Sequence, residues 1–270
     1  MSQDKAKVSI IMGIYNCEQY LDDALNSIAK QTYDNWELII CDDCSTDKTY
    51  EVARKFRDDH PNKVTLLRSG KNLKLNKTLN RCLKHAKGEF IARMDGDDIC
   101  DPQRLKEEIV FLQSHPQYDL VSCQMSLFND SGVYGRAKFP IGEVKKQDLL
   151  FGSPFCHAGM LMKKTAMDEL KGYSVGEEYI RVEDYDLWFR FYDLGKKGYN
   201  LSKVLYSMRD DDSAQKRRTW QNRYNEYILK RKIFKAFKLP FYLKTHIYRP
   251  IILYLLPAKV YSFLRKRNVR

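Results

Sequence analysis

The sequence predicts an α/β protein in which a parallel sheet is wound with crossover helices. Through the first hundred residues, short β-branched runs alternate with longer segments of helical period, as in such folds. Polar or acidic turns follow three of the expected strands. A chain of 270 residues with 43% hydrophobic and 30% charged composition can also bury a sizeable core, which excludes a disordered or fibrous protein.

The first hundred residues contain the most regular of these elements. Strands are expected where β-branched and aromatic residues cluster, at Val8 to Met12, Trp36 to Cys41, Lys63 to Arg68 and Glu89 to Met94. Helices are expected where apolar residues recur on one face, at Glu18 to Gln31 and Leu75 to Ala86.

The pattern is less regular after residue 100. It predicts helices at Pro102 to Ser114 and Glu183 to Leu194, and strands at Leu120 to Phe128, His157 to Lys163 and Lys203 to Arg209. A mixed second half of this kind is expected to bind a second substrate.

The turns after the expected strands carry the candidate functional residues. Gly13-Ile14-Tyr15-Asn16 follows the first strand, Asp42-Asp43 the second and Asp95-Gly96-Asp97-Asp98 the fourth. Ligands in open parallel sheets bind beyond the carboxyl ends of strands, so these turns are expected at one rim. Neither GxGxxG nor GxxxxGK[ST] occurs, which disfavours dinucleotide-dependent oxidoreductases and P-loop NTPases.

The MDGDD turn indicates a cation site. Carboxylates this close repel one another unless a cation joins them, and oxygen ligands favour Mg²⁺ or Mn²⁺. The alternative is an ordinary acidic turn, in which aspartate acts as a turn former and helix cap.

Four segments in order resemble glycosyltransferase family 2, whose members are inverting enzymes of GT-A fold that use nucleotide sugars. The segments are VSIIMGIYN, KQTYDNWELIICDDCSTD, HAKGEFIARMDGDD and VEDYDLWFR, and the resemblance covers roughly residues 7 to 210. It implies a GT-A type, Rossmann-like mixed sheet flanked by helices. Residues 1–215 would form the catalytic domain, with a nucleotide-sugar half at 1–100 and an acceptor half at 101–215, followed by a basic helical extension at 216–270.

The resemblance also implies roles for individual residues on the donor side. Gly13 and Tyr15 would line the base pocket, with Tyr15 stacking on uracil or another base. Asp43 would accept a hydrogen bond from the base, and Lys74 would contact the base or a phosphate. Asp95 and Asp97 match a DxD element, in which Asp97 binds the metal directly and Asp95 lies nearer the ribose or a metal-bound water.

On the acceptor side, Asp184 matches the family's catalytic base, which takes the proton of the attacking hydroxyl. Its alternative role is in the acidic first turn of a helix, together with Glu183. Trp188 could border the acceptor sugar or lie in the core, and His157 could contact the acceptor or be a structural histidine.

The cysteines and the chain start indicate the compartment. Seven cysteines without a framework spacing are typical of free thiols in a reducing cytoplasm, and a lone CxxC at Cys41 and Cys44 does not favour a zinc site. The polar start is not expected to be a signal peptide, and no apolar run approaches the ~20 residues of a spanning helix.

The basic charge is confined to the carboxyl-terminal quarter. Residues 201–270 hold 18 Lys and Arg against 4 Asp and Glu, whereas residues 1–200 hold 29 against 31. From Trp220 onward aromatic residues fall on one face and basic residues, including Arg223 and Lys230, cover the rest. This pattern predicts a helix lying on an anionic membrane surface. The alternative is that the aromatic face packs on the catalytic domain or on a second subunit.

These observations favour an inverting, metal-dependent hexosyltransferase with Mn²⁺ or Mg²⁺ as cofactor. Its donor would be a nucleotide sugar, with UDP as the expected nucleotide. Its acceptor would be a glycan or polyprenyl-linked sugar of surface polysaccharide synthesis, at the inner face of the cell membrane. A nucleic-acid-binding protein using the basic tail is one alternative, although it leaves the acidic rim without a role. A sugar nucleotidyltransferase is another, although the first turn lacks the Gly-rich basic loop that it requires.

Overall fold

The computed structural model describes residues 6–210, 219–257 and 260. Its strands are β1 Val8–Ile14, β2 Trp36–Asp42, β3 Val64–Arg68, β4 Phe90–Arg93, β5 Ile99–Cys100, β6 Leu120–Asn129, β7 Gly132–Ala137, β8 Gly142–Glu143, β9 Met160–Lys163 and β10 Gly198–Arg209. Its α-helices are α1 Leu21–Ala29, α2 Thr49–Asp59, α3 Leu75–Leu83, α4 Arg104–Ser114, α5 Lys164–Glu169, α6 Glu183–Asp193, α7 Trp220–Ala236 and α8 Arg249–Leu255. Short 3₁₀ segments are η1 Lys146–Leu150, η2 Glu177–Tyr179 and η4 Phe241–Tyr248.

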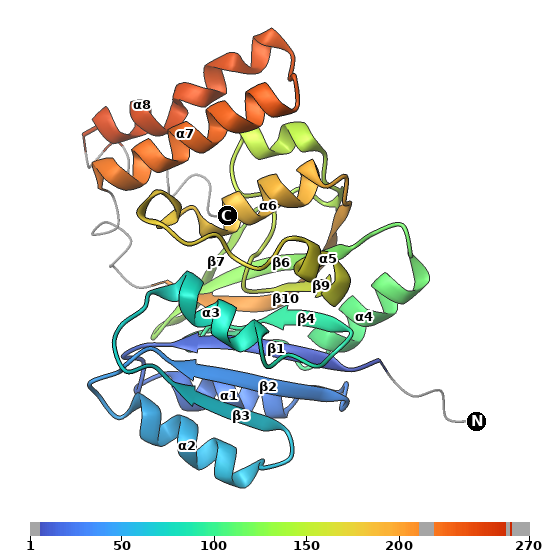
Figure 1. Ribbon diagram of the computed structural model, residues 1–270, viewed down its shortest axis with the longest axis vertical. Helices are drawn as coiled ribbons and strands as arrows, with labels where there is room; N and C mark the ends of the chain where they lie inside the picture. The colour runs from blue at the N-terminus through green and yellow to red at the C-terminus, as the bar shows by residue number, and fades with distance from the viewer. Residues whose placement is uncertain (1–5, 211–218, 258–259, 261–270) are drawn as a thin grey trace.

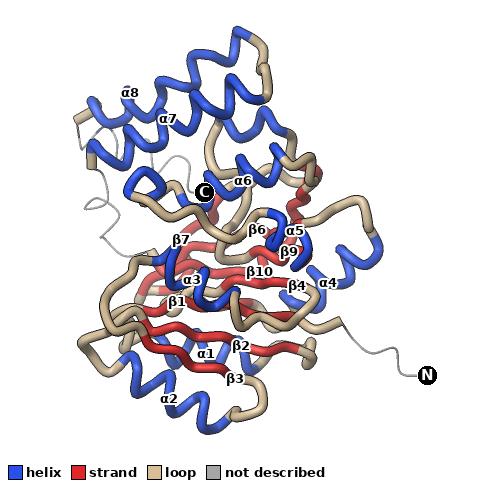
Figure 2. Tube along the Cα trace, in the orientation of Figure 1, coloured by secondary structure: helices blue, strands red, loops and turns tan. Residues whose placement is uncertain are grey.

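Within the described residues the strands form one mixed sheet with helices on both faces (Figures 1 and 2). The order is β3-β2-β1-β4-β9-β6-β10-β5, with β7 beside β6 and β8 beside β10. Strands β3, β2, β1 and β4 are parallel, whereas β9 is antiparallel to both β4 and β6. This α/β architecture of a mixed sheet flanked by helices confirms the predicted fold class.

The position of β1 decides where a ligand can bind. Strand β1 pairs with β2 on one side and with β4 on the other. The chain runs from β1 to β2 and β3 on one side and then returns to β4 on the other side of β1. This reversal of strand order opens a crevice at the carboxyl ends of these strands. The three turns singled out in the sequence all lie at this edge of the sheet.

Alternating side chains of the sheet supply two apolar layers. Val8, Ile10 and Met12 of β1 pack with α1, α2 and α4 on one face. Ile11 of β1 packs in a second cluster with residues of α3, α5 and α6 on the other face. The central strands are thus buried on both sides, which explains their nearly continuous apolar sequence.

Several element boundaries differ from the sequence prediction. Strand β10 begins five residues earlier than expected, because its pairing with β6 is irregular between Asn200 and Tyr206 and so breaks the two-residue alternation. Strand β9 begins only at Met160. Helix α2 was not predicted, since it buries only Thr49, Ala53 and Phe56 in its eleven residues.

Helix α7 corrects the expected assignment of faces in the tail. Its buried residues include Leu229, Ile233 and Lys230, and it packs on α6 and η1. Lys230, assigned to the basic outer face, is completely buried, and its Nζ donates to the Leu150 carbonyl at 2.8 Å. Burial lowers the Lys230 pKa to about 8, while Glu226, 3.6 Å away, opposes the shift. Helix α7 therefore packs on α6 and η1 through Leu229 and Ile233, whereas Trp220 and Tyr224 of the expected aromatic face stay exposed.

The remaining tail elements stay more exposed. The exposed fraction is 78% for Phe241, 74% for Tyr242 and 73% for Leu255. Among the described residues, no helix combines the length and the apolar character that crossing a membrane requires.

Candidate active site

A pocket of about 230 Å³ opens in the crevice beside β1. It is lined by Gly13, Ile14, Tyr15, Asp43, Asn72, Lys74, Leu75 and Thr78. The structure thus gathers four of the residues that the family resemblance assigned to donor binding, and it adds Asn72, Leu75 and Thr78, which the sequence did not single out.

Asp43 holds the wall of this pocket in place. It is buried, and its two carboxylate oxygens accept hydrogen bonds from the backbone amides of Leu73 at 2.8 Å and Lys74 at 2.9 Å. Lys74 has a positive φ of 70°, an unusual conformation for a residue other than glycine. These bonds stabilise that conformation, so Asp43 shapes the loop that carries Lys74.

Gly13 and Tyr15 form the opposite side of the pocket. A Cβ atom at Gly13 would lie 3.2 Å from Cγ2 of Thr78, so a larger residue would require the Thr78 side chain to shift by a few tenths of an ångström. The Tyr15 ring is half exposed, which leaves an aromatic surface available at the edge of the pocket.

The loops after β1 and β2 are joined by hydrogen bonds. The Cys17 amide donates to Oγ1 of Thr49 at 2.8 Å, and the Thr46 amide donates to Oδ1 of Asn16 at 2.9 Å. Asn16 itself has a positive φ of 47°. Strained backbone held by such contacts is characteristic of preorganised sites.

The three aspartates of the MDGDD turn have different surroundings. Asp97 is exposed, Asp95 is partly exposed, and Asp98 is buried. Asp98 accepts hydrogen bonds from the Tyr206 hydroxyl and the Arg209 amide, each at 2.8 Å. Asp98 therefore fastens the turn to β10.

Negative charge accumulates at this turn. The pKa of Asp98 is raised well above its usual value, first by burial and then by the charges of Asp95 and Asp97. A bound cation would relieve this repulsion, and the carboxylate oxygens of Asp95 and Asp97 suit Mg²⁺ or Mn²⁺. The described part of the chain holds no group of three or more His, Cys, Asp or Glu arranged for a metal. Two carboxylates, from Asp95 and Asp97, fit an ion that takes its remaining ligands from a phosphate-bearing substrate.

Asp184 stands in the first turn of α6, beside Glu183. It accepts a hydrogen bond from the Ser153 side chain and another from the Tyr185 amide. Burial raises the Asp184 pKa despite these bonds, and burial together with Asp184 raises the pKa of Glu183. A carboxylate whose pKa is raised toward neutrality is a stronger base than one in water.

Arg93 connects the MDGDD turn to the second half of the chain. Its guanidinium donates to Oδ1 of Asp95 at 2.6 Å and to Nδ1 of His157 at 3.0 Å. Nε2 of His157 lies 2.9 Å from the Tyr173 hydroxyl. Burial and then Arg93 keep the His157 pKa well below its usual value, so the imidazole is neutral and accepts from Arg93.

The same cluster brings Asp184 to the acidic rim. Arg93 interacts electrostatically with Asp95 and Glu183, and the Tyr173 phenol is within electrostatic range of Asp95, Glu183 and Asp184. Residues about ninety positions apart in the sequence thus belong to one site. Within it, His157 has the contacts of a structural histidine.

Trp188 lies in the core behind Asp184. Its ring is completely buried and packs against Phe155 and His157, with ring centroids 5.1 Å and 5.5 Å away. Its Nε1 donates to the Ser153 hydroxyl at 3.0 Å, and Ser153 in turn contacts Asp184. The ring therefore lies in the core, the second of the two positions expected for Trp188, and its contact with Asp184 runs through Ser153.

Sequence reasoning missed Arg93, Tyr173 and Ser153 as members of the site. Arg93 carried a usable signal, because a charged residue within an otherwise apolar strand, two positions before Asp95, needs a partner when it is buried. Tyr173 and Ser153 carried none, since each lies in a loop whose position depends on long-range packing.

Comparison with known proteins gives a consistent match. The model of the family described as "Glycosyl transferase family 2" matches residues 9–170. The protein described as "Putative glycosyltransferase EpsE" of Bacillus subtilis (strain 168) is 40% identical, over 97% of this chain and 94% of its own. The amylovoran biosynthesis glycosyltransferase AmsE of Erwinia amylovora is 29% identical, over 96% of this chain and 98% of its own.

A solved structure has the same fold. The structure of Staphylococcus aureus TarS residues 1–349 in complex with UDP superposes with a TM-score of 0.71, covering 95% of this chain and 74% of that one. Its sequence identity is 23%, so the likeness concerns the fold.

Proposed function

The chain belongs to glycosyl transferase family 2, and from this premise we propose that it transfers a sugar from a UDP-sugar to a hydroxyl group of a glycan or lipid-linked acceptor. The relatives support a place in the synthesis of surface polysaccharide, since AmsE is named for amylovoran biosynthesis. The binding of UDP by TarS supports the choice of nucleotide.

The pocket beside β1 is the observation that carries this proposal. It joins an exposed aromatic ring, Tyr15, to a cation, Lys74, around a loop fixed by Asp43. A ring can stack on a planar base, and a lysine can contact a phosphate. The proposal assigns the base to Tyr15 and Gly13, and the phosphates to Lys74 and the MDGDD side of the crevice.

Asp95 and Asp97 are the residues proposed to hold Mn²⁺ or Mg²⁺. When bound, such an ion stabilises the negative charge that develops on the departing diphosphate. Arg93 keeps the Asp95 carboxylate oriented through its 2.6 Å contact. Asp98 fixes the turn to β10 by accepting hydrogen bonds from the Tyr206 hydroxyl and the Arg209 amide.

Asp184 is proposed as the base that takes the proton of the acceptor hydroxyl. Ser153 and the Tyr185 amide hold its carboxylate in position, and Trp188 fixes Ser153 from the core. An acceptor oxygen activated on this side attacks the anomeric carbon from the face opposite the diphosphate, so the configuration inverts. Glu183, beside Asp184, is proposed to contact the acceptor.

The tail is proposed to rest on an anionic membrane surface at the cytoplasmic side. Phe241, Tyr242 and Leu255 expose apolar side chains while α7 packs inward, and exposed basic residues such as Lys244 and Arg249 lie beside them. Aromatic side chains next to basic ones favour the headgroup region of a bilayer.

Nucleotide binding tests the donor assignment. Isothermal titration with UDP, GDP, CDP and ADP, with and without Mn²⁺, should show tightest binding of UDP and an increase in its affinity with the metal. Equal affinity for all four nucleotides would contradict the choice of UDP. Absence of binding by any of them would contradict the proposed function itself.

A matched pair of variants tests the base. Asp184→Asn should lower kcat for transfer by ~10²- to 10⁴-fold, because the amide cannot accept the proton, while UDP affinity stays within about twofold. Asp193→Asn, the same substitution at the exposed end of α6, should leave both unchanged. Loss of UDP binding in a folded Asp184→Asn protein would argue against the assigned role.

A further inference from the structure

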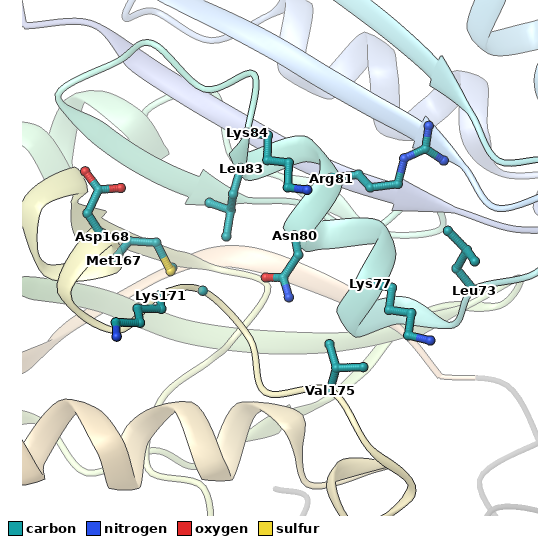
Figure 3. A pocket seen from close by; sticks show the side chains of 11 residues that line it. Leu73, Lys77, Asn80, Arg81, Leu83, Lys84, Met167, Asp168, Lys171 and Val175 are labelled. Atoms are coloured by element: carbon teal, nitrogen blue, oxygen red, sulfur yellow. The ribbon is translucent and has the colours of Figure 1, made fainter.

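A second, larger hollow lies outside the donor pocket. The cavity, about 630 Å³, runs between α3 and the segment that follows α5 (Figure 3). We name it the α3 groove and define it by Lys77, Arg81, Leu83, Lys84, Lys171 and Val175, which are among its lining residues.

Positive charge in the α3 groove is not compensated. Lys77, Lys84 and Lys171 are exposed and take part in no ion pair found within residues 6–210 and 219–257. Arg81 donates only to neutral partners, Oγ of Ser69 at 2.5 Å and a backbone carbonyl. The groove's one carboxylate is Asp168, and it already contacts Lys164 Nζ at 2.6 Å.

One wall of the groove is built rigidly. Asn80 of α3 donates to the Tyr173 carbonyl and accepts from the Tyr173 amide, both at 2.8 Å. Gly172 has a φ of 73°, and a Cβ there would lie 2.4 Å from Oδ1 of Asn80. Arg190 binds the carbonyls of Leu170 and Gly172 from the other side. The wall is therefore fixed before any ligand arrives.

The groove adjoins both sides of the active site. Tyr173 presents its backbone to Asn80, and its hydroxyl lies 2.9 Å from His157 within the Asp184 cluster. At the other end, Leu73 lines the groove, and its amide is held by Asp43 of the donor pocket. Tyr173 and Leu73 thus link the walls of the groove to the Asp184 cluster and to the donor pocket.

The spacing of the cations indicates a ligand with more than one phosphate. Lys77 and Arg81 of α3 and Lys84 at its C-cap are spaced over about 10 Å along the helix axis, at 1.5 Å per residue. Leu83 and Val175 add apolar side chains to the lining of the same groove (Figure 3). Charge and apolar contact side by side suit an amphipathic diphosphate better than a free sugar.

We propose that the α3 groove binds the diphosphate group of a lipid-linked sugar acceptor, with the first carbons of the lipid against Leu83 and Val175. This proposal rests on the proposed function and names the substrate class that the second half receives. The donor's own phosphates occupy the crevice beside β1, so the two diphosphates have separate sites.

Binding of farnesyl diphosphate in neutral detergent micelles tests the proposal, measured with saturating UDP and again without it. The variant Lys77→Gln/Lys84→Gln/Lys171→Gln should bind at least about tenfold more weakly than the wild type, since three cations near phosphates are lost. The control Lys30→Gln/Lys55→Gln/Lys106→Gln removes the same charge from exposed lysines on other elements and should bind like the wild type. UDP affinity within twofold of the wild type shows that both variants are folded.

Several results would overturn the proposal. These are equal binding by wild type and the groove variant, equal loss in both variants, and inorganic diphosphate binding as tightly as farnesyl diphosphate. Groove-dependent binding of phosphatidylglycerol vesicles or of an oligonucleotide, without binding of farnesyl diphosphate, would assign the groove to a bilayer or to nucleic acid instead. Failure of the wild type to bind UDP would contradict the proposed function and not the assignment of the groove, because groove binding is measured without turnover.

Discussion

The first hundred residues and the segment 219–257 differ in how closely their structures follow their sequence patterns. In the first region, four expected strands form the parallel part of the sheet, and the turns after them meet at one crevice. In the second, the expected helix forms, but Lys230 points inward and Tyr242 stays outside. Both regions carry recurring apolar residues, but only in the first do these residues define which faces are buried.

The difference lies in the number of ways each pattern can be satisfied. A strand that is apolar on both faces, such as β1, can only be buried between two layers. Helix α7 has aromatic and aliphatic residues on more than one face, and either face can pack on the protein. Tertiary contacts with α6 and η1 decide which face is used.

The largest expected effect is a loss of sugar transfer that occurs on substitution in the first region and not in the tail. Asp97→Ala removes an exposed carboxylate proposed to bind the metal, so transfer should fall by ~10³-fold or more, because such an ion supplies several kcal/mol of transition-state stabilisation. Lys232→Ala on the exposed side of α7 should keep more than half of the activity. Initial-rate assays with Mn²⁺ measure both. Comparable losses in the two variants would remove the functional distinction between the regions.

The next effect concerns packing within the tail. Ile233→Ala removes a completely buried side chain of α7 and should lower the free energy of unfolding by about 2–5 kcal/mol. Ile252→Ala, the same substitution on exposed α8, should change it by less than about 0.5 kcal/mol. Urea denaturation followed by circular dichroism measures both. Equal destabilisation would mean that α8 is packed as tightly as α7.

Vesicle binding tests the exposed residues of the tail directly. Ile252→Ala combined with Phe241→Ala should weaken binding to phosphatidylglycerol vesicles by about tenfold, since two apolar side chains no longer enter the headgroup region. Vesicle flotation of the double variant and of the wild type checks this. Unchanged binding would argue against the membrane role of the exposed tail residues.

A smaller effect is expected in the donor pocket. Tyr15→Ala should weaken UDP binding by about 1–3 kcal/mol, the range for stacking of one base on an aromatic side chain. Tyr15→Phe keeps the ring and should bind like the wild type. Calorimetry distinguishes the two, and a loss of affinity in Tyr15→Phe would point to the hydroxyl instead of the ring.

The smallest effect is the pH dependence that Lys230 contributes. Its pKa in the folded protein, about 8, is below its ordinary 10.5, so between these values the unfolded chain binds more protons than the folded one. Unfolding free energy should therefore rise with pH across this window, by about 1 kcal/mol per pH unit at most. Lys230→Met should lack this rise, whereas Lys232→Met, an exposed neighbour, should retain it.

Much of the fold followed from the sequence, because strand and helix periods depend on residues close together in the chain. Alternation and β-branching located the strands of the first half, and strand order then brought the turns of Gly13, Asp43 and Asp97 to one edge. Helix α2 and the start of β10 were missed, since a weak apolar stripe and an irregular register leave little local signal.

Only part of the candidate site could be predicted from the sequence. The structure gathers Gly13, Tyr15 and Asp43, which follow strands, around one pocket with Lys74, which only the family resemblance singled out. No spacing in the sequence, however, predicts that Arg93 would bridge Asp95 and His157, or that Trp188 would be buried behind Asp184.

The sequence by itself determined the α/β class, the parallel core and the turns that carry charge, because steric and hydrophobic periods act over a few residues. Only the tertiary structure decided which charges are paired or buried, as at Lys230, Asp98 and Arg93. Pairing and burial depend on which surfaces meet, and those surfaces come from segments far apart along the chain.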